Sequence, residues 1–195
     1  MNQIRAKFDT NTITVYQAYN AEISEYAVLH QRFGGTRFRM DRMTWIKPSF
    51  LWMMYRSDWA TKENQENILA IKIIRSGFTW ALSHASLTQF VPEVHSTRRE
   101  WKDNLRANPV RVQWDPDRDI LLRPLSVRAI QIGLSGEGLE KYLTGWISSI
   151  ENITEYCKEI RQLSDEGKIS QALTLLPNEQ IYPVSGPIAK RINCS

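Results

Sequence analysis

The chain has 195 residues and a net charge of +4, with 42% hydrophobic residues, 24% charged residues, nine glycines and eight prolines. This composition excludes a disordered or fibrous chain and is typical of one globular domain that buries a sizeable core. No apolar run approaches the roughly 20 residues that cross a bilayer, and the first residues lack the apolar stretch of a secretory signal. We therefore expect a cytoplasmic protein with no membrane contact, organised as one domain over residues 1–195.

The first predicted elements are a strand and a helix. Residues 12–17 are dense in β-branched and aromatic side chains, which favours a strand. Asn20 is a good N-cap, and it predicts a helix over 21–33. Gly34 and Gly35 predict the end of that helix.

The segment from Asp41 to Trp59 concentrates aromatic residues beside cations. Proline is suited to the first turn of a helix, so we expect a helix from Pro48 to about Arg56. Aromatic and methionine side chains usually pack in a core, which is the simplest interpretation of this segment. That interpretation explains a subset of its residues less well, and for these a binding site stays open as the alternative. The subset is Trp45, Lys47, Ser49, Tyr55 and Arg56.

The middle of the chain predicts three strands and one short helix. Residues 67–74 predict a buried strand, and residues 78–85 predict the helix. Residues 110–114 predict a second strand, which the turn signal Asp115-Pro116-Asp117-Arg118 ends. A third strand is expected over 125–132.

From Ser135 onward the hydrophobic period becomes helical. Apolar residues recur at the spacing of one helix face as far as Ile150, so we expect an amphipathic helix with Ser135 as its N-cap. Two more helices are predicted over 154–163 and 169–176, followed by an extended tail from about 177. The sum is an α+β fold, with a mixed or antiparallel sheet, flanking helices and a helical C-terminal third.

Positive charge is concentrated in one part of the chain. The segment 32–56 holds six basic residues against Asp41 alone, which gives it a net charge of +5 and exceeds the excess of the whole chain. Five of the six are arginines, whose planar fork of donors suits phosphate or carboxylate. Solvated surface arginines and internal ion pairs are the alternative explanation. An anionic ligand is therefore one of two interpretations of this segment.

Several standard sites are absent from the sequence. Cys157 and Cys194 form no CxxC or Cys/His grouping, so we expect neither a disulfide framework nor a metal. The GxxxxGK[ST] phosphate loop, the GxGxxG fingerprint, HExxH and GxSxG are also missing. None of these common chemistries is indicated.

Three segments resemble the hallmark blocks of a known family. They lie at residues 5–19, 41–57 and 128–134, and they look like those of the family called domain of unknown function 4291. The resemblance covers nearly the whole chain. It implies no activity, because the name of the family assigns none.

A weaker resemblance suggests a chemistry. The strand Val15–Tyr19, a helix and then Phe33-Gly34-Gly35 are similar to the opening strand and helix of toxin-like ADP-ribosyltransferases. In that family a strand arginine holds a phosphate or ribose of NAD, a central hydroxyl residue supports the site, and a late glutamate stabilises an oxocarbenium-like transition state. Gln17 stands where the arginine would be, so NAD binding requires Arg5 or Arg56 to replace it.

The same resemblance implies roles for individual residues. Tyr16 matches the tyrosine of that family, and Ser49 or Ser57 is placed by order as the central hydroxyl. Glu137 is the only late carboxylate beside a strand end, so it is the catalytic candidate. The reaction implied is nucleophilic displacement at a glycosidic carbon, with NAD as cofactor.

We expect these residues to form one site for a nucleotide or a nucleic acid. The strand end near Tyr16, the aromatic and basic segment, and the turn before Glu137 would supply its three parts. The residues expected to hold negative charge are Arg5, Lys47 and Arg56, those expected to pack on a ring are Trp45 and Tyr55, and the remaining ligand-binding candidates are Tyr16, Gln17, Tyr19, Ser49 and Gln131.

Two other classes of function fit the sequence. In a nucleic-acid-binding module, the arginines of segment 32–56 would contact phosphates while its aromatic rings stack on exposed bases. Such a module needs no catalytic carboxylate. A mainly structural interaction protein, which binds neither NAD nor an oligonucleotide, is the third class.

Overall fold

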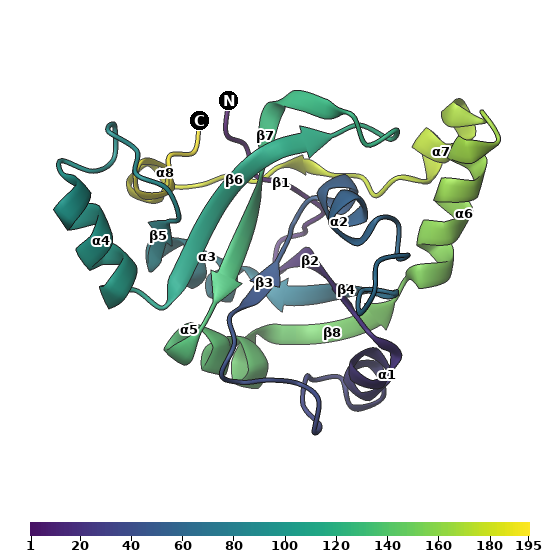
Figure 1. The fold of residues 1–195 in the computed structure, drawn as a ribbon, viewed down its shortest axis with the longest axis horizontal. Helices are drawn as coiled ribbons and strands as arrows, with labels where there is room; N and C mark the ends of the chain where they lie inside the picture. Colours follow the sequence, from purple (N-terminus) through teal and green to yellow (C-terminus); the bar gives the residue numbers. More distant parts are fainter.

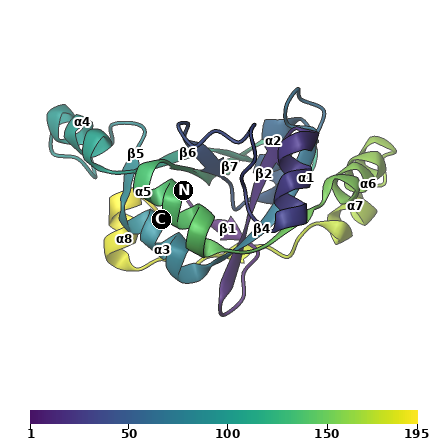
Figure 2. The same ribbon diagram turned by 90° about the horizontal axis from the view of Figure 1, so that it is seen from below.

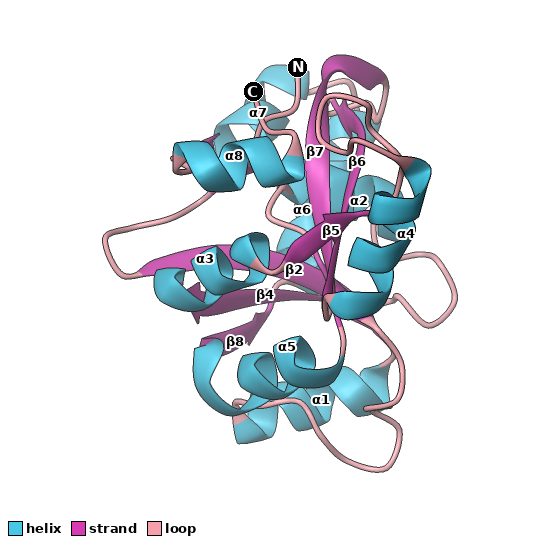
Figure 3. Ribbon diagram, turned by 90° about the vertical axis from the view of Figure 1, so that its left-hand side faces the viewer, coloured by secondary structure: helices cyan, strands magenta, loops and turns pink.

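The computed structural model describes all 195 residues, and its centre is formed by two sheets that cross one another (Figures 1 and 3). The strands are β1 (Arg5–Ala6), β2 (Thr12–Tyr19), β3 (Thr44–Ile46), β4 (Asn67–Ile74), β5 (Ala85–Leu87), β6 (Val110–Arg118), β7 (Pro124–Leu134), β8 (Ile147–Asn152) and β9 (Gln180–Ile181). One sheet has the strand order β2-β4-β8, and the other has the order β3-β7-β6-β5. Only β5 and β6 pair in parallel. The short strands β1 and β9 form a third, two-stranded sheet.

Helices surround the two sheets. They are α1 (Ala21–His30), α2 (Phe50–Ser57), α3 (Arg75–Ser83), α4 (Arg98–Ala107), α5 (Gly136–Lys141), the π-helix η1 (Tyr142–Trp146), α6 (Thr154–Asp165), α7 (Ile169–Leu175) and α8 (Gly186–Ile192). Figure 2 shows α4 at one end of the molecule and α6 with α7 at the other. None of the helices combines the length and the apolar composition needed to cross a bilayer. The architecture confirms the expected α+β class.

Two buried clusters form the core. The larger one includes Ile71 of β4, Val112 of β6 and Ile132 of β7, and it fills the space between the two main sheets. The smaller one lies on the other side of β2 and β4 and contains Phe50 and Met53 of α2. The apolar residues of α2 are therefore core, as the simplest interpretation of that segment proposed. Sheets that are buried on both faces give the continuous apolar runs seen in the sequence.

Most of the predicted elements are present within a few residues of their predicted bounds. The strands predicted over 12–17, 67–74, 110–114 and 125–132 correspond to β2, β4, β6 and β7, and the helices predicted over 21–33, 48–56, 154–163 and 169–176 correspond to α1, α2, α6 and α7. The Asn20 side chain accepts a hydrogen bond from the Ile23 amide, which caps α1 as expected. The helix ends three residues early, because Gln31 adopts the left-handed conformation with φ 52° before the two glycines are reached.

The predicted long helix from Ser135 is wrong from Ile147 onward. Helix α5 and η1 end at Trp146, and the chain continues as β8 along the edge of β4. The side chain of Gln31 in turn accepts a hydrogen bond from the Ile150 amide and donates one to its carbonyl. Backbone groups therefore find partners on both sides, and this tertiary pairing overrides the helical spacing of the apolar residues.

The predicted turn at 115–118 is also wrong, because β6 continues through it to Arg118. The ladder is irregular between Pro116 and Arg118, which accommodates a proline inside a strand. The chain reverses later, where the Asp119 carboxylate accepts hydrogen bonds from the amides of Leu121 and Arg123. Two acidic side chains that we expected in a turn are consequently fixed on a strand.

Three smaller corrections concern helices. The helix predicted over 78–85 is α3, which begins at Arg75 and ends before β5. Helix α4 has no buried residue, so it carries no apolar stripe that would predict it. The tail from 177 is not only extended, because it contains β9 and then α8 with a proline in its first turn.

Candidate functional site

Lys47 lies where the two main sheets meet. It follows β3, and its backbone exchanges two hydrogen bonds with Tyr16 of β2, with N···O distances of 2.7 and 3.1 Å. Its side chain is only 8% exposed. The ammonium donates a single hydrogen bond, to the carbonyl oxygen of Trp45 at 3.3 Å. A buried ammonium has three donors, so two of its donors here have no partner in the protein.

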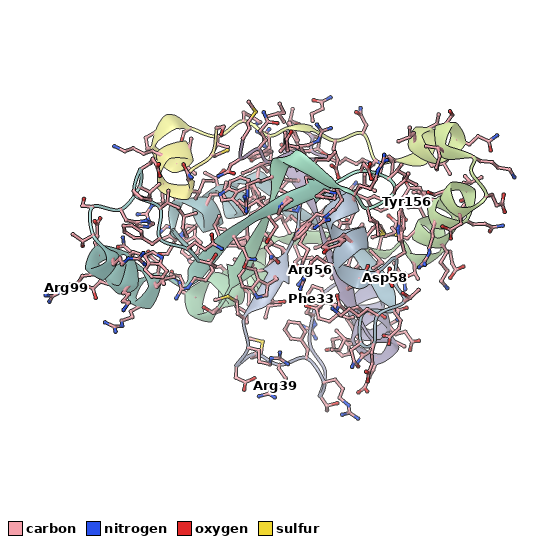
Figure 4. The ribbon with its side chains drawn as sticks, turned by 45° about the horizontal axis from the view of Figure 1, so that its top comes forward. Phe33, Arg39, Arg56, Asp58, Arg99 and Tyr156 are labelled. Atoms are coloured by element: carbon pink, nitrogen blue, oxygen red, sulfur yellow. The ribbon has the colours of Figure 1, made fainter.

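The charges around Lys47 are one cation and one carboxylate. Burial and, to a smaller extent, the positive charge of Arg56 lower the pKa of Lys47 to about 7, against the opposing effect of the Asp115 carboxylate. No carboxylate lies within ion-pair distance of the Lys47 ammonium. The Arg56 guanidinium forms no hydrogen bond or ion pair, and Figure 4 shows it between α2 and the four-stranded sheet. Neither of these two neighbouring cations therefore forms an ion pair, and Asp115 acts on Lys47 only from a longer distance.

Asp115 is already occupied by neutral donors. Gln131 of β7 donates a hydrogen bond to one of its oxygens at 2.9 Å, and Gln113 of β6 donates one to the other at 3.0 Å. These contacts hold the carboxylate and Gln131 on the sheet, beside Lys47. Gln131 thus lies on the strand next to Lys47, because Ile46 pairs with Ile132.

Trp45 gives this cluster an accessible ring. It is half-buried on β3, opposite Gly133 of β7, and its indole nitrogen donates no hydrogen bond within the protein. A Cβ atom at Gly133 would lie 3.0 Å from Cε2 of Trp45 and 2.3 Å from the sulfur of Met43. The glycine therefore allows the Trp45 ring to approach the sheet closely. We call Trp45, Lys47, Arg56, Asp115 and Gln131 the sheet-junction site.

Tyr55 is close to this site but its ring is already engaged. The ring stacks on Trp52, and the Arg118 guanidinium lies 3.6 Å from its centroid. The expectation that Tyr55 packs on a ligand ring is therefore not supported by the geometry, because both partners belong to the protein. The Arg118 guanidinium covers the stacked rings of Trp52 and Tyr55.

Gln17 and Tyr19 belong to a buried polar network instead of an open site. Gln17 donates hydrogen bonds to the hydroxyls of Tyr19 at 2.9 Å and Thr44 at 2.8 Å, and it accepts one from Tyr142 at 2.7 Å. Its side chain is 2% exposed. The polar groups that seemed suited to a ligand are satisfied by one another across β2, β3 and η1.

This network predicts a stability effect. Replacing Tyr142 by Phe leaves the Gln17 carbonyl oxygen buried without a donor, which costs about 1–3 kcal/mol. We expect a lower unfolding temperature for Tyr142→Phe in a thermal melt. Tyr55→Phe is the matched control, because the Tyr55 hydroxyl makes no hydrogen bond. Equal melting temperatures for the two variants would contradict this role of the Tyr142 hydroxyl.

Tyr16 is sealed in the smaller core cluster. Its ring packs edge-on against Phe50 at 5.6 Å between centroids, and its side chain is 2% exposed. Burial raises the pKa of its hydroxyl well above the usual value, and the nearby Glu179 adds to the effect. Tyr16 positions Lys47 through the backbone, and its ring belongs to the core cluster.

Glu137 is separated from the other candidates. It lies in the first turn of α5 with its side chain 63% exposed, and its ion-pair partner is Lys141 at 3.5 Å. No hydrogen bond or ion pair links it to Lys47, Arg56 or Ser49. The contacts are those of a carboxylate that complements a helix N-terminus.

Ser49 and Arg5 belong to a second cluster, around the start of α2. The Ser49 hydroxyl caps α2 through the Trp52 amide and donates a hydrogen bond to Asp117 at 3.1 Å. The Phe50 amide donates one to Glu179 at 2.6 Å. With Arg5, these groups line a cavity of about 710 Å³. Lys47 and Ser49 are two residues apart, about 7 Å along an extended chain, so the second cluster adjoins the sheet-junction site.

The three carboxylates of these clusters are not predicted from the sequence. Asp115 and Asp117 fall in a predicted turn, where aspartate is common for local reasons. Glu179 falls in a predicted extended tail, and nothing in the sequence links it to the start of α2. The alternation of Gln113 and Asp115 along β6 is the signal that would have placed polar groups on one face.

Comparison with protein families identifies the chain. The model of the family described as Domain of unknown function (DUF4291) matches residues 3–182. The chain belongs to this family. The match spans β1 to β9 and therefore includes every residue of both clusters. A search of curated proteins finds no match.

The sheet-junction site can hold an anion next to a flat ring. Lys47 and Arg56 offer free charged donors, and Trp45 offers an indole face at the same sheet junction. Gln131 and Asp115 fix the floor of the site. Arginine and lysine side chains that lack a carboxylate partner are suited to phosphate groups.

Proposed function

We propose that this protein binds a nucleotide or nucleotide-like cofactor that contains a diphosphate, with NAD and ADP-ribose as the first candidates. Lys47 and Arg56 hold the diphosphate, and Trp45 packs on a ring of the ligand. The observation that carries the proposal is the buried Lys47 ammonium, which has one carbonyl partner and a second unpaired cation beside it. A buried charge with no counter-ion is costly, and a bound anion removes that cost.

A diphosphate fits this arrangement better than an isolated anion. Two cations at the junction match two linked phosphates, each of which can accept charge-assisted hydrogen bonds. The neighbouring ring favours a ligand in which the phosphates are attached to a base. The weaker resemblance to ADP-ribosyltransferases points to the same ligand class.

Binding is tested by isothermal titration calorimetry with ADP-ribose on the full chain. Arg56→Gln removes one free guanidinium at an exposed position, so it is expected to fold normally. We expect its affinity to fall about tenfold or more, because a charge-assisted hydrogen bond contributes about 1.5–3 kcal/mol. The matched control is Arg39→Gln, an exposed arginine that already pairs with Asp41. Equal affinities for the two variants would contradict the proposal.

The position of the ring is tested separately through Gly133. A methyl group at this position displaces Met43 and Trp45 but removes no donor. We therefore expect Gly133→Ala to weaken ADP-ribose several-fold and to leave the affinity for inorganic pyrophosphate unchanged, because pyrophosphate has no ring. Both ligands are measured on the same variant. A parallel loss for both would show that Trp45 is not the stacking residue.

A nucleic-acid-binding module and an ADP-ribosyltransferase are distinguished in the same series. Titration with a short single-stranded oligonucleotide shows whether the arginine-rich segment binds nucleic acid, which requires a steep loss of affinity with salt. Release of nicotinamide from NAD that is lost in Glu137→Gln extends the proposal to glycosyl transfer. The exposed position of Glu137 gives no support for that extension, so the proposal is limited to binding.

A further inference from the structure

The 710 Å³ cavity has a polar end and an apolar wall. Arg5, Asp117 and Glu179 lie at the polar end, next to the start of α2, and the charged lining is completed by Arg118, Asp119 and Arg123, of which Arg123 is paired with Asp119. Eight of its seventeen lining residues are hydrophobic, and they come from α2, from the β6–β7 hairpin and from α7. Leu125 and Leu173 are 41% and 50% exposed there. A cavity of this volume is within the range of small-ligand sites.

Asp117 is almost fully buried and forms no ion pair, and the charges of Arg5 and Arg118 act on it only from a longer distance. Its side chain is 4% exposed, and one oxygen accepts hydrogen bonds from the Ser49 hydroxyl and from the Arg118 amide. The other oxygen accepts none. Both donors are neutral, so the carboxylate has no ion-pair partner within 4 Å. Burying a carboxylate without an ion-pair partner is energetically costly, and a bound cation would reduce this cost.

Glu179 lies beside it and is half-buried. One of its oxygens accepts a hydrogen bond from the Phe50 amide, and the other is free. Burial and, to a smaller extent, the negative charge of Asp117 raise the pKa of Glu179 to about 8. Burial raises the pKa of Asp117 as well. These two carboxyl groups therefore share an environment that a positive charge would relieve.

Arg5 supplies the opposite charge at the mouth. It is exposed, and its guanidinium makes no hydrogen bond or ion pair, although its charge acts on both carboxyl groups. No third His, Cys, Asp or Glu joins Asp117 and Glu179 in an arrangement that could hold a metal ion. The cation that fits is therefore an organic one, and a carboxylate on the same ligand would pair with Arg5.

We infer that this cavity is a second ligand site, which binds a small zwitterion with an aliphatic body, such as an aliphatic α-amino acid. Its ammonium lies between the free oxygens of Asp117 and Glu179, its carboxylate pairs with Arg5, and its side chain lies along Leu125 and Leu173. The site is independent of the nucleotide proposal, because it uses none of the residues of the sheet-junction site.

Three matched ligands test the inference by calorimetry on the full chain. L-leucine has both charges, 3-methylbutan-1-amine has only the ammonium, and 4-methylpentanoate has only the carboxylate. We expect leucine to bind about tenfold or more tightly than either analogue, because each lost ion pair costs at least one charge-assisted hydrogen bond. Glycine, which lacks the aliphatic body, should bind more weakly than leucine.

Two variants separate the two ends of the ligand. Arg5→Gln changes an exposed side chain, and we expect it to reduce the affinity for leucine to that for the amine. Asp117→Asn keeps the hydrogen bonds from Ser49 and Arg118 but removes the charge, and we expect it to weaken leucine and the amine about tenfold or more. Thermal melts of each variant verify folding. The inference is overturned by the absence of saturable heat with leucine, or by leucine binding that neither variant alters.

Discussion

Replacing Lys47 by Met is expected to stabilise the protein and to abolish ADP-ribose binding in the same variant. Lys47 is 8% exposed, and burial lowers its pKa to about 7. An unfolded lysine keeps its ordinary pKa of about 10.5. Between pH 7 and about 10.5 the unfolded state therefore binds more protons than the folded state, and the buried lysine lowers the free energy of unfolding at neutral pH. Methionine has nearly the same length and no charge. We expect a gain of roughly 1–4 kcal/mol in the free energy of unfolding at pH 7.

The gain has a distinct pH dependence. Because the folded pKa is depressed, the destabilisation by Lys47 is complete below pH 7 and diminishes as the pH rises toward 10.5. The stabilisation by Met should therefore be larger at pH 6 than at pH 9, as measured by urea unfolding. Lys62→Met, at an exposed position, is the control and should leave stability unchanged at both pH values. A less stable Lys47→Met variant would show that the lysine serves the fold and not a ligand.

The residues of the sheet-junction site could be predicted only in part. Trp45, Lys47 and Arg56 are candidates because aromatic residues next to cations are poorly explained by a core, and Gln131 is a candidate because it lies near a strand end before the turn to Glu137. The partners that define the site come from elsewhere. Asp115 reaches Gln131 only because β6 pairs with β7, a contact between residues 16 positions apart. Single-sequence patterns report local periodicity, and they carry no information about which strands pair.

Two residues that the sequence suggests for a ligand site, Gln17 and Tyr19, belong instead to a buried polar network in the structure. Gln17 and Tyr19 are polar residues at a strand end, which is a common position for ligand groups. In the structure Tyr142, 125 residues further along the chain, uses the Gln17 carbonyl oxygen. Composition cannot distinguish a polar residue that faces a ligand from one that is satisfied inside the core. The same reason applies to β8. Its apolar spacing favours a helix, but its pairing with β4 makes it a strand, and the local sequence does not show that pairing.

The affinity for ADP-ribose is expected to fall about 30-fold between pH 6 and pH 8.5, because the ligand requires the protonated form of Lys47. The diphosphate of ADP-ribose carries a constant charge over this range, so the protein group dominates the titration. Calorimetry in buffers of different ionisation enthalpy should show uptake of about half a proton per ligand at pH 7, rising toward one at pH 8.5. The charged groups that face Lys47 are Arg56 of α2 and Asp115 of β6. A pH-independent affinity would contradict the assignment of Lys47 as the group that binds the diphosphate.

Lys47→Arg identifies the titrating group. Arginine stays protonated at every accessible pH, so this variant should bind ADP-ribose with a flat pH profile if its larger head is accommodated. The cavity at Asp117 and Glu179 gives a contrast of opposite sign. An ammonium ligand there favours the ionised form of Glu179, which Asp117, Arg5 and the Tyr16 hydroxyl also face. Leucine should therefore release a proton and bind more tightly as the pH rises from 6 to 8.5, whereas ADP-ribose takes one up and binds more weakly. Opposite slopes in one chain require two separate sites, and a shared slope would mean that a single group controls both ligands.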